Sequence, residues 1–278
     1  MNNGSLNKIE KEYVLGTHDE EIERLGLQHR VWRPRALDAW RRAGFNVGHT
    51  ILDLGCGPGY CSIDLAEIVG RSGRVIGVDV SGRFVEAARA LADQRQLKNI
   101  DFHELDICTS ALPEIEVDGI WTRWVFCFLK EPEKALRNAV SLLKPGGTIV
   151  VHEYFCYSTW QTMPPSKELT EFVDLVKKSW IAEGGDPDIG LRLVPWMGEL
   201  DLEIMDIRPI VDVVGADNFV WQWPTTFLNN GINRLAEKDH ISYERASYLK
   251  SAIEQNQSSP DSKLVTPALL EITARRRK

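Results

Sequence analysis

The sequence predicts an α/β protein with a doubly wound, mostly parallel β-sheet. Apolar, strand-like runs alternate with helix-like periodicity between residues 50 and 151, a pattern typical of sheets covered by helices on both faces. A loop with glycine at every second position, Gly55, Gly57 and Gly59, joins the first strand to the first helix of this region. Ligands bind such folds at the carboxyl ends of the strands, so we expect the functional site there.

The composition is that of a single folded domain with a small-molecule partner. The chain has 278 residues, of which 43% are hydrophobic and 26% charged, which is ample for one domain with insertions. The formal net charge of −7 argues against nucleic acid, because nucleic-acid binders draw most of their affinity from phosphate neutralisation. The basic cluster at 275–278 is interpreted as a solvated tail, with a docking patch as the alternative.

Cysteine and hydropathy patterns bear on the compartment. The five cysteines form no C-x-x-C pair, which suits a reducing environment better than a disulfide framework or a zinc site. The N-terminal segment is polar, and no apolar run approaches the length of a membrane span. We therefore expect a cytoplasmic monomer or homodimer with no metal and no membrane partner.

The glycine loop has features that select its ligand. A dinucleotide fingerprint requires a third glycine where this chain has Tyr60 or Ser62, so a pyrophosphate ligand is disfavoured. Asp53 stands two places before the first glycine. A carboxylate there would repel a pyrophosphate but suits a ligand that carries an ammonium group.

At the residues Asp53 to Gly59 the chain resembles the class I S-adenosylmethionine-dependent methyltransferases, in particular their small-molecule, UbiE-like group (methyltransferase type 11). In that family a D/E-x-G-x-G-x-G loop receives the methionine end of the cofactor. The resemblance implies a Rossmann-like, seven-stranded sheet with an antiparallel last strand, and S-adenosyl-L-methionine as cofactor, released as S-adenosyl-L-homocysteine. A chance glycine turn is the alternative.

The next elements supply further cofactor contacts. Asp79 ends an apolar run and follows the loop by about 20 residues, the spacing at which an acid reaches a ribose diol; a strand-end acid used only locally is the alternative. By the resemblance, Asp106 and Ile107 border the adenine, unless Asp106 is simply a solvated loop acid. The expected cofactor-binding residues are Tyr13, Gln28, Asp53, Gly55, Cys56, Gly57, Gly59, Asp79, Val80, Asp106, Ile107, Thr122 and Arg123.

The segment after the fourth predicted strand, 117–122, restricts the chemical classes of acceptor that the protein could methylate. It lacks the N/D-P-P-Y/F tetrapeptide of nucleobase amine methyltransferases, which argues against such acceptors. Arg123 has three possible partners: an acidic acceptor, a carboxylate near the cofactor, or a structural salt bridge. Leu-Lys-Pro-Gly-Gly at 143–147 is a further family mark and is predicted to end a helix and turn into the fifth strand.

The N-terminal segment is predicted to cap the site. A capping box at Thr17 to Glu20 starts one helix, and Pro34 starts a second, 35–43. Relatives of this type carry a Y-x-L-G segment and a glutamine that fold over the cofactor, which makes Tyr13 and Gln28 the expected contacts. An amphipathic helix that only covers the sheet is the alternative.

Acceptor binding is assigned to the end of the fifth strand and to an insertion. His152 and Glu153 are the catalytic candidates, needed only if the acceptor must lose a proton. Residues 212–263 are predicted as an aromatic-rich lid between a sixth strand, 202–211, whose Pro209 indicates an edge or a bend, and a last strand, 264–274. The expected substrate contacts, which core packing explains equally well, are Trp124, Tyr154, Tyr157, Trp160, Trp221, Trp223 and Phe227.

The sequence thus predicts one methyltransferase domain that modifies an N, O or C atom of a small molecule. The alternative is an S-adenosylmethionine-binding protein with a structural cofactor or a cyclisation or rearrangement activity. Within residues 1–278 we expect an N-terminal cap (1–46), a cofactor-binding core (47–155), helices with the sixth strand (156–211), the lid (212–263) and the last strand with the tail (264–278).

Overall fold

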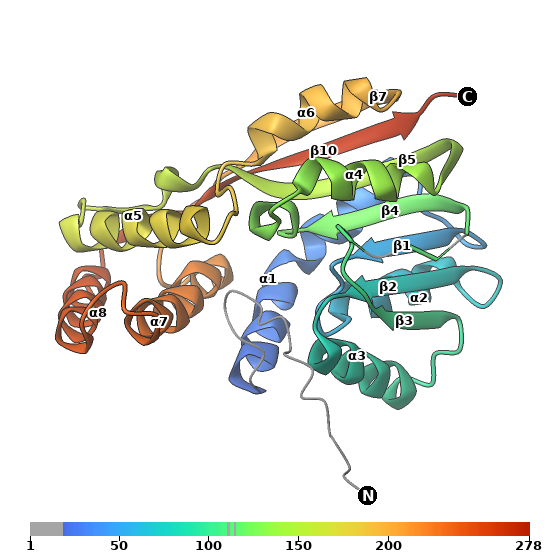
Figure 1. Cartoon of the computed structure of the whole chain (residues 1–278). Coiled ribbons are helices and arrows are strands. Elements are labelled where there is room, and N and C mark those ends of the chain that lie inside the picture. The colour runs from blue at the N-terminus through green and yellow to red at the C-terminus, as the bar shows by residue number, and fades with distance from the viewer. Residues whose placement is uncertain (1–18, 110–111, 114) are drawn as a thin grey trace, which may run out of the picture.

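The computed structural model describes residues 19–109, 112–113 and 115–278. Its centre is a seven-stranded sheet of order β3-β2-β1-β4-β5-β10-β7 (Figure 1). Strand β10 pairs antiparallel with β5 and β7, whereas the pairs among β1 to β5 are parallel, so the predicted Rossmann-like topology is confirmed. The strands are β1 (Thr50–Leu54), β2 (Arg74–Asp79), β3 (Ile100–Glu104), β4 (Val117–Arg123), β5 (Leu143–Cys156), β7 (Leu202–Ile210) and β10 (Ala268–Arg276).

Helices cover both faces of the sheet because successive strand residues point to opposite sides. Ile51 and Val150 pack with α1 and α2, whereas Leu52 and Val151 pack with α4 and α6. The helices are α1 (Asp19–Ala43), α2 (Tyr60–Val69), α3 (Gly82–Gln94), α4 (Pro132–Ser141), α5 (Lys167–Ala182), α6 (Gly190–Glu199), α7 (Gln222–Glu237) and α8 (Tyr243–Gln257).

The prediction of two N-terminal helices is wrong: α1 is one continuous helix with Pro34 inside it. The predicted capping residue Thr17 lies outside the described residues. A proline inside a helix costs about 3 kcal/mol, but Trp32 before it and Trp40 after it are both fully buried. Two buried indole rings contribute more than the proline costs, so packing keeps the helix continuous.

The prediction of a single last strand is also wrong. β9 (Lys263–Val265) joins a second, three-stranded sheet with β6 (Gln161–Met163) and β8 (Val213–Val214), and β10 starts only at Ala268. Pro267 lies between them and has no N–H to continue a ladder. β3 ends at Glu104, before Asp106, and β5 already starts within the Leu-Lys-Pro-Gly-Gly segment. β7 is an edge strand, as Pro209 indicated.

The insertion 212–263 forms α7 and α8, which pack beside α5 at the end of the molecule toward which the parallel strands point (Figure 1). Helix α1 lies between this group and the sheet. Helix α7 starts at Gln222, so Trp223 and Phe227 of the predicted lid lie on a helix, and both are buried. The carboxyl ends of β1, β2 and β4 therefore face α1 and the insertion.

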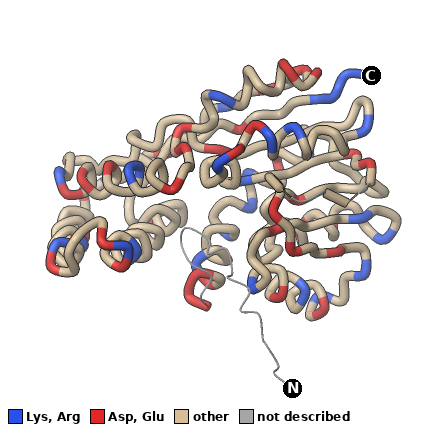
Figure 2. The backbone as a smooth tube through the Cα atoms, in the orientation of Figure 1, with Lys and Arg blue, Asp and Glu red and all other residues tan. Residues whose placement is uncertain are grey.

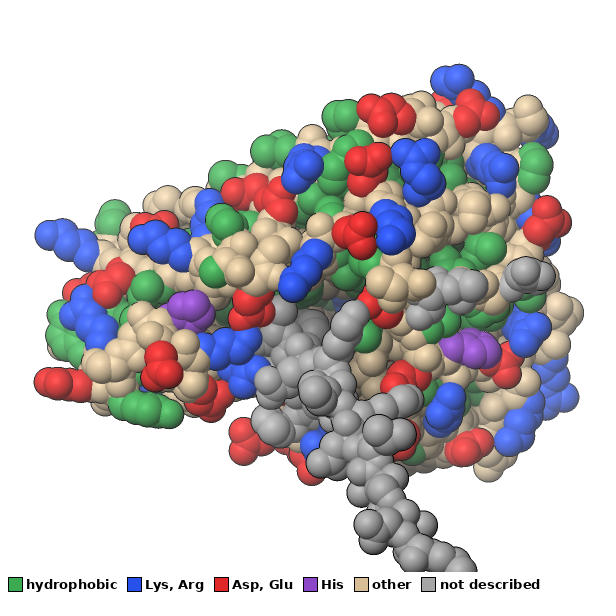
Figure 3. All heavy atoms as spheres, viewed as in Figure 1, with side chains coloured by type: hydrophobic (Ala, Val, Ile, Leu, Met, Phe, Trp, Pro, Cys, Tyr) green, Lys and Arg blue, Asp and Glu red, His purple; other side chains and the backbone are tan. Residues whose placement is uncertain are grey.

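The surface carries mixed charge. Lys and Arg positions lie among Asp and Glu positions along the backbone (Figure 2), and side chains of both signs are interspersed on the face shown in Figure 3, in keeping with 33 Lys and Arg against 40 Asp and Glu residues. Within the described part of the chain, each helix is too short or too polar to traverse a lipid bilayer.

Candidate functional site

A cavity of about 660 Å³ lies at the carboxyl ends of β1, β2 and β4, beside the N-terminal half of α1. Of the predicted substrate contacts, Trp124 lines it. Of the predicted cofactor residues, Gly59 and Thr122 do not line the cavity, and Tyr13 lies outside the described residues. The predicted cofactor residues that line it are Gln28, Asp53, Gly55, Cys56, Gly57, Asp79, Val80, Asp106, Ile107 and Arg123.

The three loop glycines serve different purposes. All have positive φ, between 53° and 82°, where glycine is favoured. A Cβ on Gly55 would lie 2.2 Å from a methyl of Val125, and one on Gly59 would lie 2.7 Å from the Cβ of Ala88. A Cβ on Gly57 would meet nothing within 4 Å and would enter the cavity. Close packing therefore requires the outer two glycines, whereas at Gly57 the absence of a side chain leaves the backbone open on the cavity.

Asp79 ties the loop to the sheet. Its Oδ2 accepts from the backbone N–H of Gly57 at 2.8 Å and its Oδ1 from that of Ser81 at 2.9 Å. Ser81 caps α3 by accepting from the N–H of Phe84. Each carboxylate oxygen has a second lone pair, so the local role leaves Asp79 able to accept from a ligand.

Asp53 is a buried carboxyl in the cavity wall, 2% exposed. It accepts from the Ser62 hydroxyl at 2.5 Å. Burial raises the pKa of Asp53 to about 7, although the Ser62 hydroxyl and the charge of Arg123 oppose the shift. A cationic ligand group beside it would favour the ionised form.

Sequence reasoning missed part of the wall that α1 supplies. His29 lines the cavity, its Nε2 lies 3.1 Å from Asp64 Oδ2, and its ring stacks on that of Tyr60 with centroids 5.8 Å apart. Burial lowers the pKa of His29, against the effect of its bond to Asp64. The signal was available, because Leu25, Gln28 and His29 have the spacing of a single helix face.

A chain of polar contacts links α7 to the cavity through α1. The Asn230 amide donates to Glu21 at 3.2 Å, Glu21 pairs with Arg24 at 2.7 Å, and Arg24 donates to Gln28 at 2.9 Å. Glu21 and Arg24 are buried. The insertion is therefore connected to the cavity wall by side-chain contacts that pass through α1.

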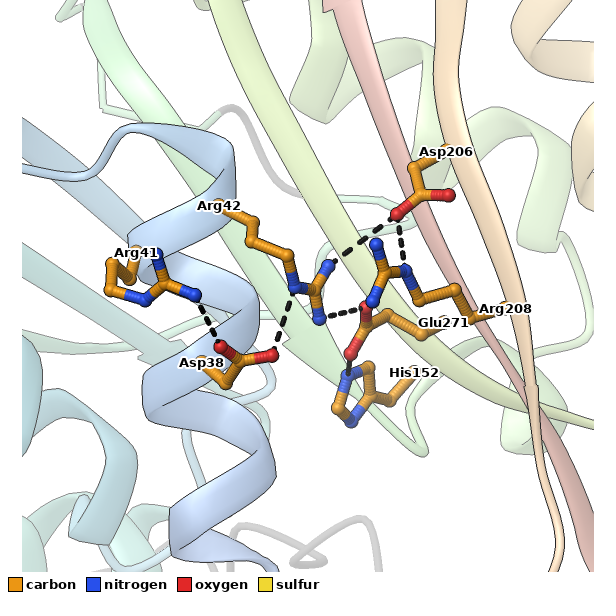
Figure 4. A network of polar contacts seen from close by, with 7 residues as sticks. All are labelled: Asp38, Arg41, Arg42, His152, Asp206, Arg208 and Glu271. Atoms are coloured by element: carbon orange, nitrogen blue, oxygen red, sulfur yellow. Dashed lines mark hydrogen bonds and ion pairs between the residues drawn. The ribbon is translucent and has the colours of Figure 1, made fainter.

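His152, a predicted catalytic residue, is fully buried and does not line the cavity. Its Nε2 lies 2.9 Å from the Oε2 of Glu271 on β10, and Arg42 of α1 binds the other oxygen of Glu271 at 2.5 Å (Figure 4). Burial lowers the pKa of His152, although its bond to Glu271 acts in the opposite direction. The rings of Trp32 and Trp121 contact the imidazole, and a catalytic role for His152 stays a prediction.

Glu153, the second catalytic candidate, is also fully buried and outside the cavity wall. Its Oε1 accepts from the backbone N–H groups of Val125 and Phe126 at 2.6 and 2.7 Å. Burial raises the pKa of Glu153 to about 7 despite these bonds. The observed contacts fix the turn after β4, which carries Arg123 and Trp124 into the wall.

The other predicted substrate contacts pack in one aromatic cluster outside the cavity lining. Trp124 stacks on Trp223 and on Tyr154, with ring centroids 5.4 and 5.7 Å apart, and Trp160 contacts Phe227 at 6.0 Å. The arrangement agrees with core packing, and substrate contact stays a prediction. The members outside the lining are Tyr154, Tyr157, Trp160, Trp221, Trp223 and Phe227.

Comparison with known proteins identifies the family to which this chain belongs. A family model described as a methyltransferase domain matches residues 45–183, half of the chain, and the chain belongs to this family. It is similar to the demethylmenaquinone methyltransferase of Lactococcus lactis subsp. lactis (strain IL1403), with 32% identity over 144 residues, 52% of this chain and 54% of that protein. The aklanonic acid methyltransferase of Streptomyces sp. (strain C5) is 32% identical over 134 residues, 48% of this chain and 59% of that protein.

These matches span little more than half the length of the two relatives. Among solved structures, the YcgJ protein of Bacillus subtilis shares the fold, with a TM-score of 0.58 and 18% identity over 90% of this chain and 99% of that one.

Proposed function

We propose that this protein transfers a methyl group from S-adenosyl-L-methionine to a small-molecule acceptor. The observation that carries the proposal is the cavity at the carboxyl ends of β1 and β2, into which the backbone opens at Gly57 beside the Asp79 carboxylate. The printed activities of the two relatives, on demethylmenaquinone and on aklanonic acid, support a small-molecule acceptor.

The residues of the cavity fit the cofactor. Asp53 is a buried carboxyl that a ligand ammonium group would ionise, and Asp79 keeps lone pairs for a ribose diol. Asp106 and Ile107 border the part of the wall proposed for the adenine. The other cavity residues proposed to contact the cofactor are Gln28, Gly55, Cys56 and Val80. Bound S-adenosyl-L-methionine supplies a methyl group that its sulfonium already activates.

The chain itself then has to orient the acceptor and exclude water. Trp124 of the turn after β4 lines the cavity for this purpose, and the buried rings of Trp32 on α1 and Trp223 on α7 pack against it outside the lining. We assign cofactor binding to the core, residues 47–155, and the exclusion of water to the predicted lid, residues 212–263.

Incubation of the protein with S-adenosyl-L-methionine and a metabolite extract tests the proposal. We expect S-adenosyl-L-homocysteine to accumulate and mass spectrometry to show a product heavier by one methylene unit, whereas a Gly57→Val variant should produce neither. Tight cofactor binding without S-adenosyl-L-homocysteine would favour the non-methylating alternative, a structural cofactor or a cyclisation, over transfer.

A further inference from the structure

Four neighbouring buried N–H groups, two of them on side chains that line the cavity, have no hydrogen-bond acceptor among the described residues. They are the indole Nε1 of Trp32 and of Trp124 and the Nη1 of Arg35 and of Arg123. Buried donors are nearly always paired in proteins, because each unpaired one costs the free energy of its lost hydration. Four such donors in one place therefore require an explanation.

These four side chains form one contiguous group, which we call the Arg123 subsite. The Trp124 ring lies edge-on to that of Trp32, with centroids 5.1 Å apart. The Arg35 guanidinium lies 4.8 Å from the Trp32 ring and the Arg123 guanidinium 5.1 Å from the Trp124 ring. Arg123 and Trp124 line the cavity, whereas Trp32 and Arg35 lie outside its lining, so the subsite meets the cavity through Arg123 and Trp124.

The subsite is cationic. Arg35 pairs with Asp212 through Nη2, but among the described residues no carboxylate oxygen lies within 4 Å of Arg123. The structural salt bridge considered for Arg123 is thus not formed with any described residue. Guanidinium and indole groups carry only donors, so the partner that satisfies this group must be an acceptor, and its charge should be negative.

The geometry of the subsite is fixed before any ligand binds. Trp124 has a φ of +53°, a strained conformation for a bulky residue that persists only where its surroundings impose it. Its backbone N–H donates to the carbonyl of His152 at 3.0 Å, and the next two N–H groups donate to Glu153. These bonds fix the backbone that carries the Trp124 side chain and follows Arg123, which reduces the reorganisation needed to bind an oxyanion there.

We propose that the Arg123 subsite binds an anionic oxygen, a carboxylate or a phenolate, on a flat apolar acceptor. This rests on the proposed function and adds the chemical class of the substrate. The Trp124 side of the subsite borders the insertion, because Trp223 of α7 stacks on Trp124, while the charge of Arg123 also acts on the Asp53 carboxyl of the same cavity. The indole faces suit the flat body of such an acceptor, and Arg123 its charge.

Calorimetry on the full chain saturated with S-adenosyl-L-homocysteine tests this with 2-naphthoate and its neutral isostere 2-naphthamide. We expect the anion to bind at least about tenfold more tightly than the amide, the factor typical of one charge-assisted pair. Arg123→Gln should reduce that preference to within about twofold, and Arg123→Lys should retain part of it because a lysine keeps the charge without the planar fork.

Arg137→Gln is the matched control, since Arg137 is an exposed arginine of α4 paired with Glu133 and its loss should leave the preference intact. Trp32→Phe and Trp124→Phe remove an indole N–H but keep an aromatic ring. Each should weaken naphthoate more than naphthamide, so the proposal stays testable even if Arg123→Gln does not fold.

Equal binding of the two probes, failure of naphthoate to bind, or an unchanged preference in Arg123→Gln would overturn the subsite. So would a loss of S-adenosyl-L-homocysteine affinity of about tenfold or more in Arg123→Gln, because that would assign Arg123 to the carboxylate of the cofactor. Methyl transfer by the wild-type protein with no preference between the probes would reject the subsite and leave the proposed function standing.

Discussion

The backbone N–H of Gly57 donates to the Oδ2 of Asp79 at 2.8 Å. This bond joins the turn after β1 to the end of β2, so the two sequence features that indicated a cofactor, the glycine loop and the acid after it, form one structural unit. Burial raises the pKa of Asp79, while its bonds to the N–H groups of Ser81 and Gly57 oppose the shift. Removing this carboxylate should therefore disturb the loop as well as a ribose contact.

Asp79→Ala should weaken S-adenosyl-L-methionine binding by about 1.5–3 kcal/mol, or roughly ten- to a hundredfold, because charge-assisted hydrogen bonds to the ribose are lost. Asp79→Asn keeps one acceptor oxygen and should lose less. Calorimetric titration measures both, with Asp101→Ala as a control, since Asp101 is an exposed β3 residue paired with Arg74. A loss below about threefold in Asp79→Ala would mean that the ribose is held elsewhere.

Gly57→Val should abolish cofactor binding in a folded protein. The branched side chain would project into the cavity and is strained at a φ of +53°. Gly44→Val is the matched control, because Gly44 also has a positive φ, 81°, and open space around its Cβ position but does not line the cavity. The same calorimetric titration separates strain from occlusion, and unchanged affinity in Gly57→Val would contradict the proposed site.

The fold followed from the sequence where local pattern and long-range packing agree. In α2 and β2, for example, turn glycines and apolar runs mark both ends, so local signals and packing point to the same elements. Pro34 was expected to start a new helix, but burial of Trp32 and Trp40 keeps α1 continuous. The break at Pro267 was not predicted, because β9 and β10 belong to two different sheets and only knowledge of both sheets would separate them. Local signals alone carry no information on such distant partners.

The site was predictable to a similar degree. The glycine loop and Asp79 follow from backbone requirements that glycine and a strand-end acid meet locally. The partners of His152 and Glu153 do not, because Glu271 stands more than a hundred residues from His152 and Glu153 contacts the turn after β4. The proposed Arg123 subsite likewise forms only where α1 and the turn after β4 meet. A polar residue near the carboxyl end of a strand can therefore hold the backbone in place, as Glu153 does for Val125 and Phe126.

The pKa of Glu153, raised to about 7 by burial, predicts a pH-dependent stability. The folded chain binds this proton more tightly than the unfolded one, whose glutamate titrates near its ordinary value of about 4.5. The free energy of unfolding should therefore fall as the pH rises from about 5 to about 8, by up to about 2 kcal/mol for this group. Glu153→Gln removes that proton but keeps an acceptor oxygen for Val125 and Phe126.

Urea unfolding of wild type and Glu153→Gln at the two pH values measures the effect. The difference in unfolding free energy should shift in favour of the variant at the higher pH. Glu254→Gln, at an exposed position of α8, controls for a general change of charge. A difference that is the same at both pH values would show that Glu153 is ionised throughout, held by the two backbone N–H groups.

The last prediction is that residues 212–263, with the N-terminal segment, close over the site when ligands bind. The polar chain from Asn230 through Glu21 and Arg24 to Gln28 couples α7 to the cavity wall, so ligand contact at Gln28 should order both elements. Hydrogen exchange should show amides 221–230 and 19–28 gaining protection on addition of S-adenosyl-L-homocysteine and acceptor. The earlier part of the predicted N-terminal segment, 13–18, lies outside the described residues.

Amides 148–151 of β5 serve as the internal reference, because they are buried in the sheet and should be protected in both states. Equal protection of 221–230 with and without ligand would show that α7 is a rigid part of the fold. Acceptor specificity would then be set by a preformed pocket rather than by closure, because the stacked rings of Trp124 and Trp223 would not separate during the catalytic cycle.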